Sequence, residues 1–528
     1  MKTFTTHRWT RLGAASRAAW ACLGVNSRRS RVLLALIVGL GLIPARWITA
    51  QTFTTLHSFT DVSDGANPSA GLISSGNTLF GTAMGGGSSD AGTIFAVNTD
   101  GGGFTNLHDF TRSSTNASGA LTNSDGAEPV AGLILSGDTL YGTASYGGSS
   151  GCGTVFAVNT NGTGFTNLYS FTATSHTYPP TNSDGALPHG GLILSGGTLY
   201  GTAGHGGSSG HGTLFAVSTD GTGFTNLHNF SAISPFPDYT NYDGAEPVAG
   251  LILSRDTLYG AASYGGNWGN GTVFAVNTNG TGFTNLHSFT AVPFQTPYTN
   301  GDGADPQAGL VLSGSTLYGT AVAGGNWGNG TVFKLNTDGS AFTNLHSFTA
   351  TSGPPSTNSD GAYPYAGLTT SGGDTLYGTA RLGGPSGYGT VFSINTNGTG
   401  FTGLYFFTVP DPVTNTNRDG GSPTDALSLS GNVLYGTADV GGSSGSGTLF
   451  SLSFAPKLTI TPSGTNVILT WPTNVAGFDY IGFALQSTTN LLSPAVWTAV
   501  LPTPVVADGQ NAVTDPVSGA KRFYRLSQ

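Results

Sequence analysis

Seven Asp-Gly steps recur along the chain, and carboxylates placed by a repeat are able to hold calcium. The seven aspartates are Asp64, Asp125, Asp184, Asp243, Asp302, Asp360 and Asp419. Each step supplies only one acidic side chain, without the alternating aspartates of a calcium-binding loop. Asp and Gly also favour tight turns, because Asp bonds to nearby backbone and Gly accepts a positive φ. The sequence therefore favours a structural turn at each step, with calcium binding as the alternative.

Recurring histidines are candidates for a metal site. Five copies of a segment similar to "LHSF" carry His57, His108, His228, His287 and His346, and two copies carry Tyr169 and Tyr405 instead. Tyrosine does not replace a metal-binding histidine without consequence, and side chains on separate sheets are too far apart to share an ion. A further group, His189, His205 and His211, lacks a cysteine or acidic partner at ligand spacing. We therefore expect packed strand histidines and predict neither a metal ion nor a cofactor.

Two tryptophans mark a place where the copies of one glycine-rich loop differ. The fourth and fifth copies read "GGNWGNG", which puts Trp268 and Trp327 where other copies have Ser. The loop is expected to open on the same face as the long connections between sheets. The candidate ligand-binding residues are therefore Trp268, Trp327, Tyr264, Tyr239 and Tyr298, with Phe236 and Phe294 in the same connections. Flat rings among Asn and Asp suit carbohydrate or peptide contact, whereas the alternative is that each Trp packs over its own loop.

Motifs for catalysis are lacking in the sequence after residue 50. No Ser lies in a G-x-S-x-G elbow between a strand and a helix. Glycoside cleavage needs two carboxylates at a controlled separation. Glu occurs only at Glu128 and Glu246, and each Asp is interpreted as keeping its role in the repeat. We assign no catalytic residue and expect a protein that is not an enzyme. The alternative is a polysaccharide-acting hydrolase or lyase that uses Asp residues of the repeats.

The first fifty residues differ from the rest in composition. They hold eight of the 17 Lys and Arg and none of the 26 Asp and Glu, and they include the apolar run "VLLALIVGLGLI". This pattern predicts a signal peptide over residues 1–50, with cleavage before Gln51, because the run is too short for a comfortable membrane span. The alternative is an uncleaved anchor. We therefore expect a secreted or cell-surface protein without a membrane span after cleavage.

Cleavage of that segment leaves nine Lys and Arg against 26 acidic residues, a net charge of about −17. Such a surface argues against nucleic acid as a partner. Cys152 is the only cysteine after residue 50, so no disulfide within the chain is available. The hydrophobic core and the backbone hydrogen bonds must then stabilise the exported protein.

A repeat of about 59 residues organises the chain from residue 51 to residue 454. Seven copies carry the Asp-Gly step, an "L[YF]G" segment and a "GT[VIL]F" segment at the same intervals. Each copy has four short runs rich in β-branched and aromatic residues, bounded by Gly, Asn, Asp and Ser, which predicts four strands. The fold class is therefore all-β, and four strands in each of seven repeats predict a seven-bladed β-propeller.

The order of strands follows from the connections. The segments "SGDT" and "NTDG" predict tight hairpins, whereas the longest and most variable connection precedes each Asp-Gly step. The chain begins with an unmatched outer strand at residues 53–59, and the seventh repeat ends without one. We predict that residues 53–59 pair with residues 447–454, so that the N-terminal strand closes the propeller and covers its sheet edges.

The repeat pattern ends after Phe454. Residues 455–528 contain short strand-like runs with Pro and Gly between them. These features predict a small β-sandwich of immunoglobulin or fibronectin type, with Trp471 in its core.

The seven matching copies carry a resemblance to a known family. The pattern G-L-[IV]-x-S-G-x-T-L-Y-G-T-A-x-x-G-G over residues 53–454 is similar to the GloVer tandem repeat of large exported bacterial proteins. The tail resembles C-terminal β-sandwich modules of secreted bacterial proteins. The resemblance implies export and a repeat architecture, and it implies no known reaction. We expect a monomeric, non-enzymatic extracellular module that binds carbohydrate or protein on the loop face of the propeller.

Overall fold

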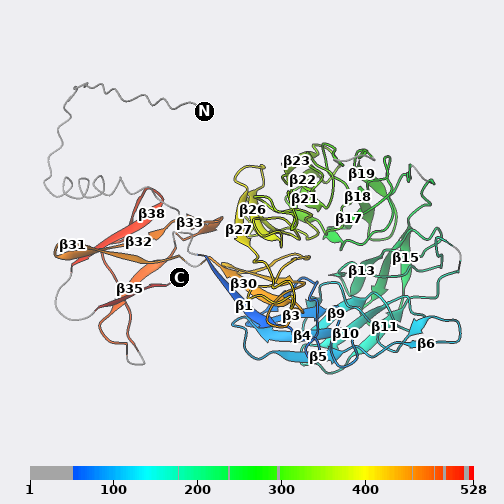
Figure 1. Cartoon of the computed structure of the whole chain (residues 1–528), viewed down its shortest axis with the longest axis horizontal. Helices are drawn as coiled ribbons and strands as arrows, with labels where there is room; N and C mark the ends of the chain where they lie inside the picture. Colours follow the sequence, from blue (N-terminus) through cyan, green and yellow to red (C-terminus); the bar gives the residue numbers. More distant parts are fainter. Residues whose placement is uncertain are drawn as a thin grey trace, which may run out of the picture. The chain divides into compact units, whose positions relative to one another are not determined.

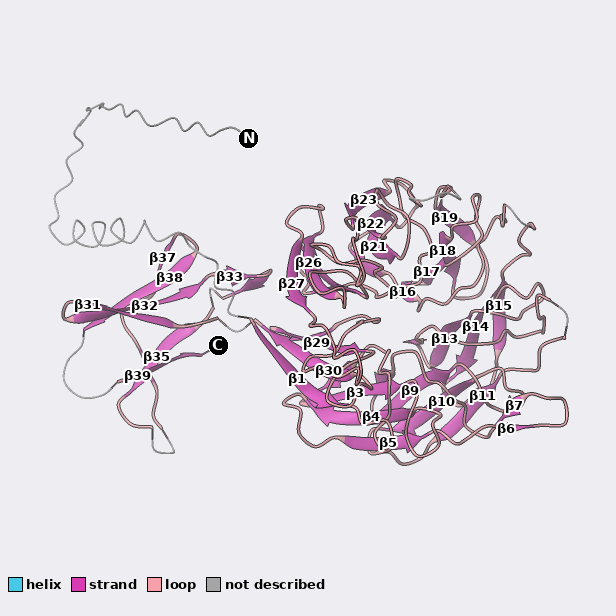
Figure 2. Ribbon diagram, in the orientation of Figure 1, coloured by secondary structure: helices cyan, strands magenta, loops and turns pink. Residues whose placement is uncertain are grey.

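The computed structural model describes residues 51–527 except residues 177, 236–237, 294–297, 455, 481, 492–494 and 517–521. The described part contains strands and turns and no helix, as the all-β prediction requires (Figure 2). Within it, therefore, no helix is long and apolar enough to cross a membrane. The predicted signal peptide, residues 1–50, lies outside the described residues.

Seven four-stranded antiparallel sheets follow one another along the chain, and we number them as repeats 1 to 7. Repeat 1 contains β2 (Ile73–Ser75), β3 (Thr78–Ala83), β4 (Thr93–Asn98) and β5 (Thr105–Asp109). Repeat 2 contains β8 (Ile134–Ser136), β9 (Thr139–Ala144), β10 (Thr154–Asn159) and β11 (Thr166–Ser170). Repeat 3 contains β12 (Ile193–Ser195), β13 (Thr198–Ala203), β14 (Thr213–Ser218) and β15 (Thr225–Asn229). Repeat 4 contains β16 (Ile252–Ser254), β17 (Thr257–Ala262), β18 (Thr272–Asn277) and β19 (Thr284–Ser288).

The remaining three sheets have the same plan. Repeat 5 contains β20 (Val311–Ser313), β21 (Thr316–Ala321), β22 (Thr331–Asn336) and β23 (Thr343–Ser347). Repeat 6 contains β24 (Thr369–Thr370), β25 (Thr375–Ala380), β26 (Thr390–Asn395) and β27 (Thr402–Phe406). Repeat 7 contains β28 (Ser428–Ser430), β29 (Val433–Ala438), β30 (Thr448–Ser453) and, from the chain start, β1 (Thr52–Ser58). A short hairpin of β6 (Ser114–Thr115) and β7 (Leu121–Thr122) lies between repeats 1 and 2. Figure 1 shows the seven sheets following one another around a common centre, a propeller-like arrangement.

Turn chemistry sets the limits of the strands, as the sequence predicts. In repeat 2 the hairpin between the third and fourth strands closes with a hydrogen bond from Asn159 N to Thr163 O of 3.0 Å. Gly162 in this turn has a φ of 80°, which side chains other than Gly rarely adopt. The tight hairpin predicted at the "NTDG" segment, which reads "NTNG" in repeat 2, is therefore confirmed.

A second glycine allows close packing inside each sheet. Gly142 on β9 lies opposite Phe156 on β10. A Cβ atom at Gly142 would lie only 2.6 Å from Phe156 Cζ and 2.7 Å from Leu133 Cδ2. The missing side chain thus makes room for the buried Phe ring, which explains why the Gly of "L[YF]G" and the Phe of "GT[VIL]F" recur together.

The first strand of the chain pairs with the last strand of the repeats. β1 is antiparallel to β30, with Thr52 opposite Ser453 and Ser58 opposite Thr448. A register shift between Thr55 and His57 matches the irregularity seen in the other fourth strands, for example between Val155 and Phe156. The predicted pairing of residues 53–59 with residues 447–454 is confirmed.

Hydrophobic cores lie between neighbouring sheets. One cluster joins Phe80 and Ile94 of repeat 1 to Leu140 and Phe156 of repeat 2. An equivalent cluster joins Leu79 and Phe95 of repeat 1 to Tyr435 and Leu449 of repeat 7. Each sheet therefore buries its apolar faces against the next one.

The tail forms its own sheets. Four strands pair in the order β31 (Thr459–Ser463), β32 (Asn466–Pro472), β38 (Gln510–Pro516) and β37 (Val505–Ala507). Three strands pair in the order β36 (Thr498–Ala499), β35 (Ala484–Thr488) and β39 (Phe523–Ser527), and β33 (Asn474–Val475) pairs with β34 (Phe478–Asp479). Trp471 is fully buried, as predicted for a core residue.

Candidate functional site

The Asp of each Asp-Gly step is buried in a hydrogen-bond cluster with the preceding fourth strand. Asp243 accepts a hydrogen bond from His228 Nε2 at 2.9 Å, from Ser231 N at 3.0 Å and from the Ser231 hydroxyl. Burial disfavours the charged form of Asp243, but the hydrogen bonds from His228 and Ser231 outweigh it and lower the pKa. The structural interpretation of these aspartates is therefore supported, but the carboxylate binds the neighbouring strand rather than its own turn.

The same cluster explains the histidines and the two tyrosines. His57, His108, His228, His287 and His346 each lie within 3.0 Å of the Asp of the following step. In the other two copies the hydroxyls of Tyr169 and Tyr405 donate to Asp184 and Asp419 at 2.8 Å. Tyrosine and histidine are interchangeable here because either side chain can donate a hydrogen bond to the Asp carboxylate. In the described residues no three His, Cys, Asp or Glu side chains are placed to hold one metal ion.

Stacked rings join each fourth strand to the next. The pairs are His57 with Phe104, His108 with Phe165, Tyr169 with Phe224, His228 with Phe283, His287 with Phe342, His346 with Phe401, and Tyr405 with Phe53. Ring centroids are 3.7 to 4.0 Å apart and the rings are nearly parallel. The repeated His, Tyr and Phe residues are thus scaffold, and the candidate site lies elsewhere.

The predicted loop aromatics occupy two kinds of position. Trp268 is 56% exposed and Trp327 is 54% exposed, and Tyr239 and Tyr298 are also exposed. A Cβ atom at Gly269, beside Trp268, would lie 3.4 Å from Tyr239 Cβ, so Tyr239 lies against the Trp268 loop. The Trp327 loop approaches the backbone of Tyr298 in the same way. Phe236 and Phe294 lie outside the described residues.

The structure brings Trp268 and Tyr239 to one loop pair and Trp327 and Tyr298 to the next. Tyr264 differs from the other four because it lines an interior cavity as well as being 44% exposed. It starts the loop that carries Trp268 four residues further on.

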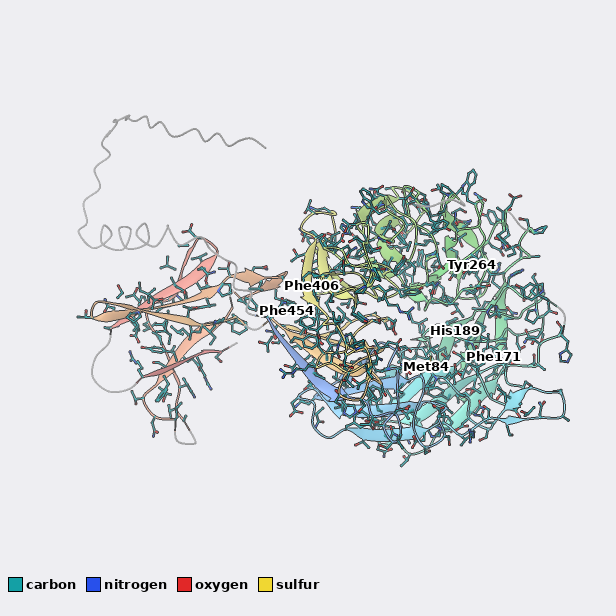
Figure 3. All side chains as sticks on the ribbon, viewed as in Figure 1. Met84, Phe171, His189, Tyr264, Phe406 and Phe454 are labelled. Atoms are coloured by element: carbon teal, nitrogen blue, oxygen red, sulfur yellow. The ribbon has the colours of Figure 1, made fainter. Side chains whose placement is uncertain are left out.

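A cavity of about 690 Å³ lies among the inner ends of the sheets, and we call it the central cavity. All seven repeats line it through the residue that follows the proline of the "DGAxP" segment, which reads "DGGSP" in repeat 7. These residues are Ser69, Val130, His189, Val248, Gln307, Tyr365 and Thr424. His189 and Tyr264, which are labelled in Figure 3, come from the neighbouring repeats 3 and 4 and both line the cavity. The segment that leads into each first strand, such as residues 130–134 of repeat 2, therefore forms the wall of the cavity, in agreement with the predicted strand order.

Four positions in each repeat differ strongly between copies although the residues around them are constant, and we call them the rim positions. In repeat 4 they are Glu246 and Val248, on either side of the proline, and Ser263 and Tyr264, after β17. All four line the central cavity. Aligning the seven copies residue by residue would have shown these positions from sequence, because they vary while the residues next to them are repeated.

The residue before the proline is held in an unusual conformation in every repeat. The φ values lie between 53° and 59° at Asn67, Glu128, Leu187, Glu246, Asp305, Tyr363 and Ser422. Residues other than Gly rarely adopt this left-handed region, and such strain persists only where surrounding contacts impose it. Glu246 N donates to His211 O of the preceding repeat at 3.0 Å, and Ser263 N donates to Glu246 O at 3.2 Å. These bonds fix the direction in which the Glu246 side chain leaves the backbone.

Repeats 4 and 5 place two carboxylates beside the cavity. Asp305 accepts a hydrogen bond from Gln307 Nε2 at 2.9 Å through Oδ2, whereas Oδ1 is buried without a partner. Burial, partly offset by Gln307 and reinforced by Glu246, raises the pKa of Asp305 to about 6. Burial also raises the pKa of Glu246, against the influence of His205. The negative charges of Asp305 and Glu246 in turn raise the pKa of the Tyr264 hydroxyl.

Asp425 corrects the expectation that every Asp keeps its repeat role. It stands where the other six copies have Ala or Gly, and it lines the central cavity. Its carboxylate accepts hydrogen bonds from the backbone of Gly71 in repeat 1 and of Ala426. Burial raises its pKa to about 6 even though these hydrogen bonds oppose the shift.

Several buried polar atoms around the cavity have no hydrogen-bond partner. They include the hydroxyl oxygens of Ser69, Ser263 and Thr424, all of which line the cavity, and Oδ1 of Asp305. Ser263 is only 2% exposed. Buried polar groups are normally satisfied, so unpartnered atoms that converge on one cavity favour a polar ligand or ordered water there.

The fold and the site together define an all-β repeat protein of propeller-like sheets with a polar central cavity. The chain belongs to the family of proteins with the Gloeobacter/Verrucomicrobia repeat, whose model matches residues 47–236, 114–297 and 234–450. This result confirms the tandem-repeat family expected from the sequence. No curated protein matches the chain at a significant level.

Solved structures of other proteins are similar to this chain at low sequence identity. An oligogalacturonate lyase from Vibrio parahaemolyticus matches 76% of this chain and 93% of its own, with 10% identity and a TM-score of 0.43. A putative 6-phosphogluconolactonase from Bacteroides fragilis matches 85% of this chain and 98% of its own, with 14% identity and a TM-score of 0.41. The β-propeller domain of the Trilobed protease from Pyrococcus furiosus matches 72% of this chain and 93% of its own, with 8% identity and a TM-score of 0.37.

Proposed function

We propose that this protein is an exported, non-enzymatic binding module that holds a polar ligand, carbohydrate or protein, at the rim of the central cavity. One observation carries the proposal. The residue after the proline differs between copies and lines a single cavity in all seven repeats, and in repeat 4 all four rim positions line it together with buried polar atoms without partners. A repeated scaffold whose residues vary at one shared cavity is the pattern expected when that cavity selects a ligand.

The proposed architecture is a closed seven-bladed propeller followed by a small β-sandwich at residues 455–528. The pairing of β1 with β30 supports closure. The stack of Tyr405 on Phe53 supports it too, because the same ring contact joins all the remaining pairs of neighbouring repeats. The two layers of tail strands support the sandwich. A ring fixed in this way would hold the rim positions at constant separations, which a preorganised binding site needs.

Export rests on the sequence pattern of residues 1–50. We expect the mature chain to begin at Gln51 and to act as a secreted or cell-surface monomer. Mass spectrometry of the protein recovered from culture medium or envelope gives the mass of the chain from Gln51 if cleavage occurs. A mass that still includes residues 1–50 would instead indicate an anchor.

The exposed aromatics extend the proposed site outward. Tyr264 lies at the cavity and Trp268 lies four residues further along the same loop, with Tyr239 beside it. Trp327 and Tyr298 form the matching pair in repeat 5. A ligand that begins at the cavity and continues over repeats 4 and 5 would meet all five candidate residues, because aromatic faces suit sugar rings and peptide side chains.

An array of glycans and peptides tests the binding function. We expect the mature protein to bind one chemical class on the array and Tyr264→Ala to weaken that signal. Tyr146→Ala is the matched control, because Tyr146 holds the same position in repeat 2 but is not among the residues that line the cavity. Equal loss for both variants, or no selective binding by the wild-type protein, would contradict the proposal.

A polysaccharide-acting hydrolase or lyase is the second candidate. One observation favours it, since Asp305 has a raised pKa and lies near a second carboxylate, Glu246, as acid–base catalysis requires. Release of reducing ends or unsaturated sugars from the polysaccharides that bind on the array distinguishes the candidates. Binding without turnover supports the module, whereas turnover that Asp305→Asn abolishes supports the enzyme.

A further inference from the structure

We propose that the rim of repeats 4 and 5 recognises a protonated amine carried on a hydroxyl-rich, sugar-like ligand, with Glu246 and Asp305 as the residues that bind the amine. This inference rests on the proposed binding function and names the chemical class of its ligand. It replaces the broad choice between carbohydrate and protein with one testable class, an amino sugar.

The first argument is the unpaired negative charge of this part of the rim. Within the described residues, the only salt bridges are the five His–Asp pairs of the fourth strands and the Arg522–Asp515 pair of the tail. Glu246 and Asp305 therefore have no Lys or Arg partner at ion-pair distance. A carboxylate that is partly removed from water is stabilised strongly by a cation, so this site would gain most from a positively charged ligand.

The nearby cation does not cancel this charge. Arg381 of repeat 6 lies over the ring of Tyr365, 5.3 Å from its centroid, and attracts Asp439 of repeat 7. Asp425 is held by the backbone of Gly71 and Ala426. The charges of repeats 6 and 7 are thus compensated locally, whereas no Lys or Arg among the described residues pairs with Glu246 or Asp305 and His205 is the group that favours the charged form of Glu246.

The second argument is independent of charge. Ser263 lies between the two carboxylates in the chain, is 2% exposed, lines the central cavity and has a hydroxyl without a partner. An unpartnered buried hydroxyl costs folding free energy unless a ligand or water satisfies it. The ring of Tyr264, next to Ser263, adds a partly exposed aromatic face on the same cavity. A hydroxyl partner and an aromatic face are what a sugar ring uses, and the carboxylates add a place for an amine.

The two glutamates of the chain supply a matched control. Glu128 and Glu246 hold the same position in two nearly identical segments, and both have a φ of 55°. Glu246 lines the central cavity, and Glu128 is not among its lining residues. The two substitutions Glu246→Gln and Glu128→Gln therefore change the same backbone position but should differ in their effect on binding.

The test is isothermal titration calorimetry of the mature protein at neutral pH with three matched probes. The probes are an oligomer of β-1,4-linked glucosamine, its fully N-acetylated counterpart and the β-1,4-glucan oligomer of equal length. We expect the glucosamine oligomer to bind at least about tenfold more tightly than the other two, since a hydrogen bond to a charged group is stronger than one between neutral groups. Glu246→Gln and Asp305→Asn should each remove most of that preference, and Glu128→Gln should leave it unchanged.

Other outcomes separate this inference from the proposed function. Equal binding of all three oligomers would overturn the amine assignment and leave the binding module in place. Binding of none of them, together with selective binding of another class on the array, would likewise overturn the amine assignment alone. A preference for the glucosamine oligomer that survives in the Glu246→Gln/Asp305→Asn double variant would place the amine elsewhere and also contradict the inference. Circular dichroism of each variant verifies that its fold is retained.

Discussion

The ring of Tyr405 lies on the ring of Phe53 with centroids 3.9 Å apart and an angle of 10° between their planes. These residues are 352 positions apart in the chain, yet their contact repeats the stack of His57 on Phe104 between the first strand and repeat 1. Phe53 stands on β1, so the same strand that pairs with β30 also contacts repeat 6. The N-terminal strand is therefore the element through which the two ends of the repeat region are joined.

Removal of Phe53 should destabilise the repeats. Phe53→Ala deletes a half-buried ring that contacts Tyr405, Phe407 and Phe450. Loss of a packed Phe typically costs about 3 kcal/mol, and we expect a loss of about 2 kcal/mol here because the ring is only partly buried. Chemical denaturation followed by fluorescence measures this change.

Phe283→Ala is the matched control, since Phe283 makes the same stack with His228 between repeats 3 and 4. We expect a similar loss from it. Deletion of residues 51–59 should lower the unfolding midpoint far more than either point variant. A deletion variant as stable as the full mature chain would contradict the closing role of β1.

The buried Asp–His clusters predict acid sensitivity. The pKa values of Asp125, Asp243 and Asp302 are lowered in the folded protein, because hydrogen bonds to the carboxylates outweigh the effect of burial. A carboxyl group with a lowered folded pKa contributes stability above its ordinary pKa of 3.8 and loses it as the pH falls through the folded value. We therefore expect the free energy of unfolding to fall steeply below about pH 4.

The variant Asp243→Asn should show a smaller fall in the free energy of unfolding at acid pH than the wild type. It should also lower stability at neutral pH by about 1 to 3 kcal/mol, because His228 and Ser231 lose a charged acceptor. Thermal unfolding at a series of pH values measures both effects. An unchanged acid dependence in the variant would show that this cluster does not set the stability.

Asp425 predicts the opposite pH dependence. Its pKa is raised to about 6 by burial, so the folded protein binds this proton more tightly than the unfolded chain does. Its contribution to stability is complete below the ordinary pKa of 3.8 and is lost as the pH rises through about 6. Asp425→Asn keeps an acceptor for Gly71 N without a titrating group.

The stability difference between wild type and Asp425→Asn should therefore shift in favour of the variant between pH 4 and pH 7. Paired unfolding curves at these pH values give the difference directly and cancel the effects of the other carboxyl groups. A difference that stays constant over this range would contradict a buried, titrating Asp425.

The loop tryptophans should affect binding without affecting folding. Trp268 and Trp327 are more than half exposed, so Trp268→Ala and Trp327→Ala should each change the free energy of unfolding by no more than about 0.5 kcal/mol. On a glycan array the double variant should retain the ligand class bound by the wild type but bind it more weakly. If every array signal were unchanged, the ligand would not extend from the cavity onto these loops.

The sequence predicts the fold well because its signals are local and repeated seven times. Tight hairpins at Asn-Gly and Asp-Gly, runs of β-branched and aromatic residues and the unmatched segment at residues 53–59 suffice to predict four-stranded sheets and the β1–β30 pairing. The partners of the Asp carboxylates were harder to predict. Their hydrogen bonds to residues 4 to 17 positions away depend on how the long connection folds back.

The candidate site was predicted only in part, for a geometric reason. The sequence predicts Tyr264 as an aromatic residue near Trp268, but its place on the cavity depends on how segments of all seven repeats come together around one cavity. Glu246 and Asp305 precede prolines, where an extended backbone is expected, and their positive φ values could not be inferred from sequence. Asp425 can be recognised from the sequence as an exception among the aspartates, because it replaces an Ala or Gly of the other copies.

The central claim is that the rim of the cavity binds a ligand, and Ser263 tests it most directly. Its hydroxyl has no partner in the free protein, so Ser263→Ala removes no internal hydrogen bond and should leave stability unchanged or slightly higher. Ser145→Ala is the matched control, because Ser145 is equally buried at the same position of repeat 2 and is not among the cavity-lining residues. The measurement is calorimetric titration of both variants with the ligand that binds most tightly on the array. We predict a loss of affinity of about five- to tenfold for Ser263→Ala and none for Ser145→Ala, and equal affinities for both variants and the wild type would contradict the claim.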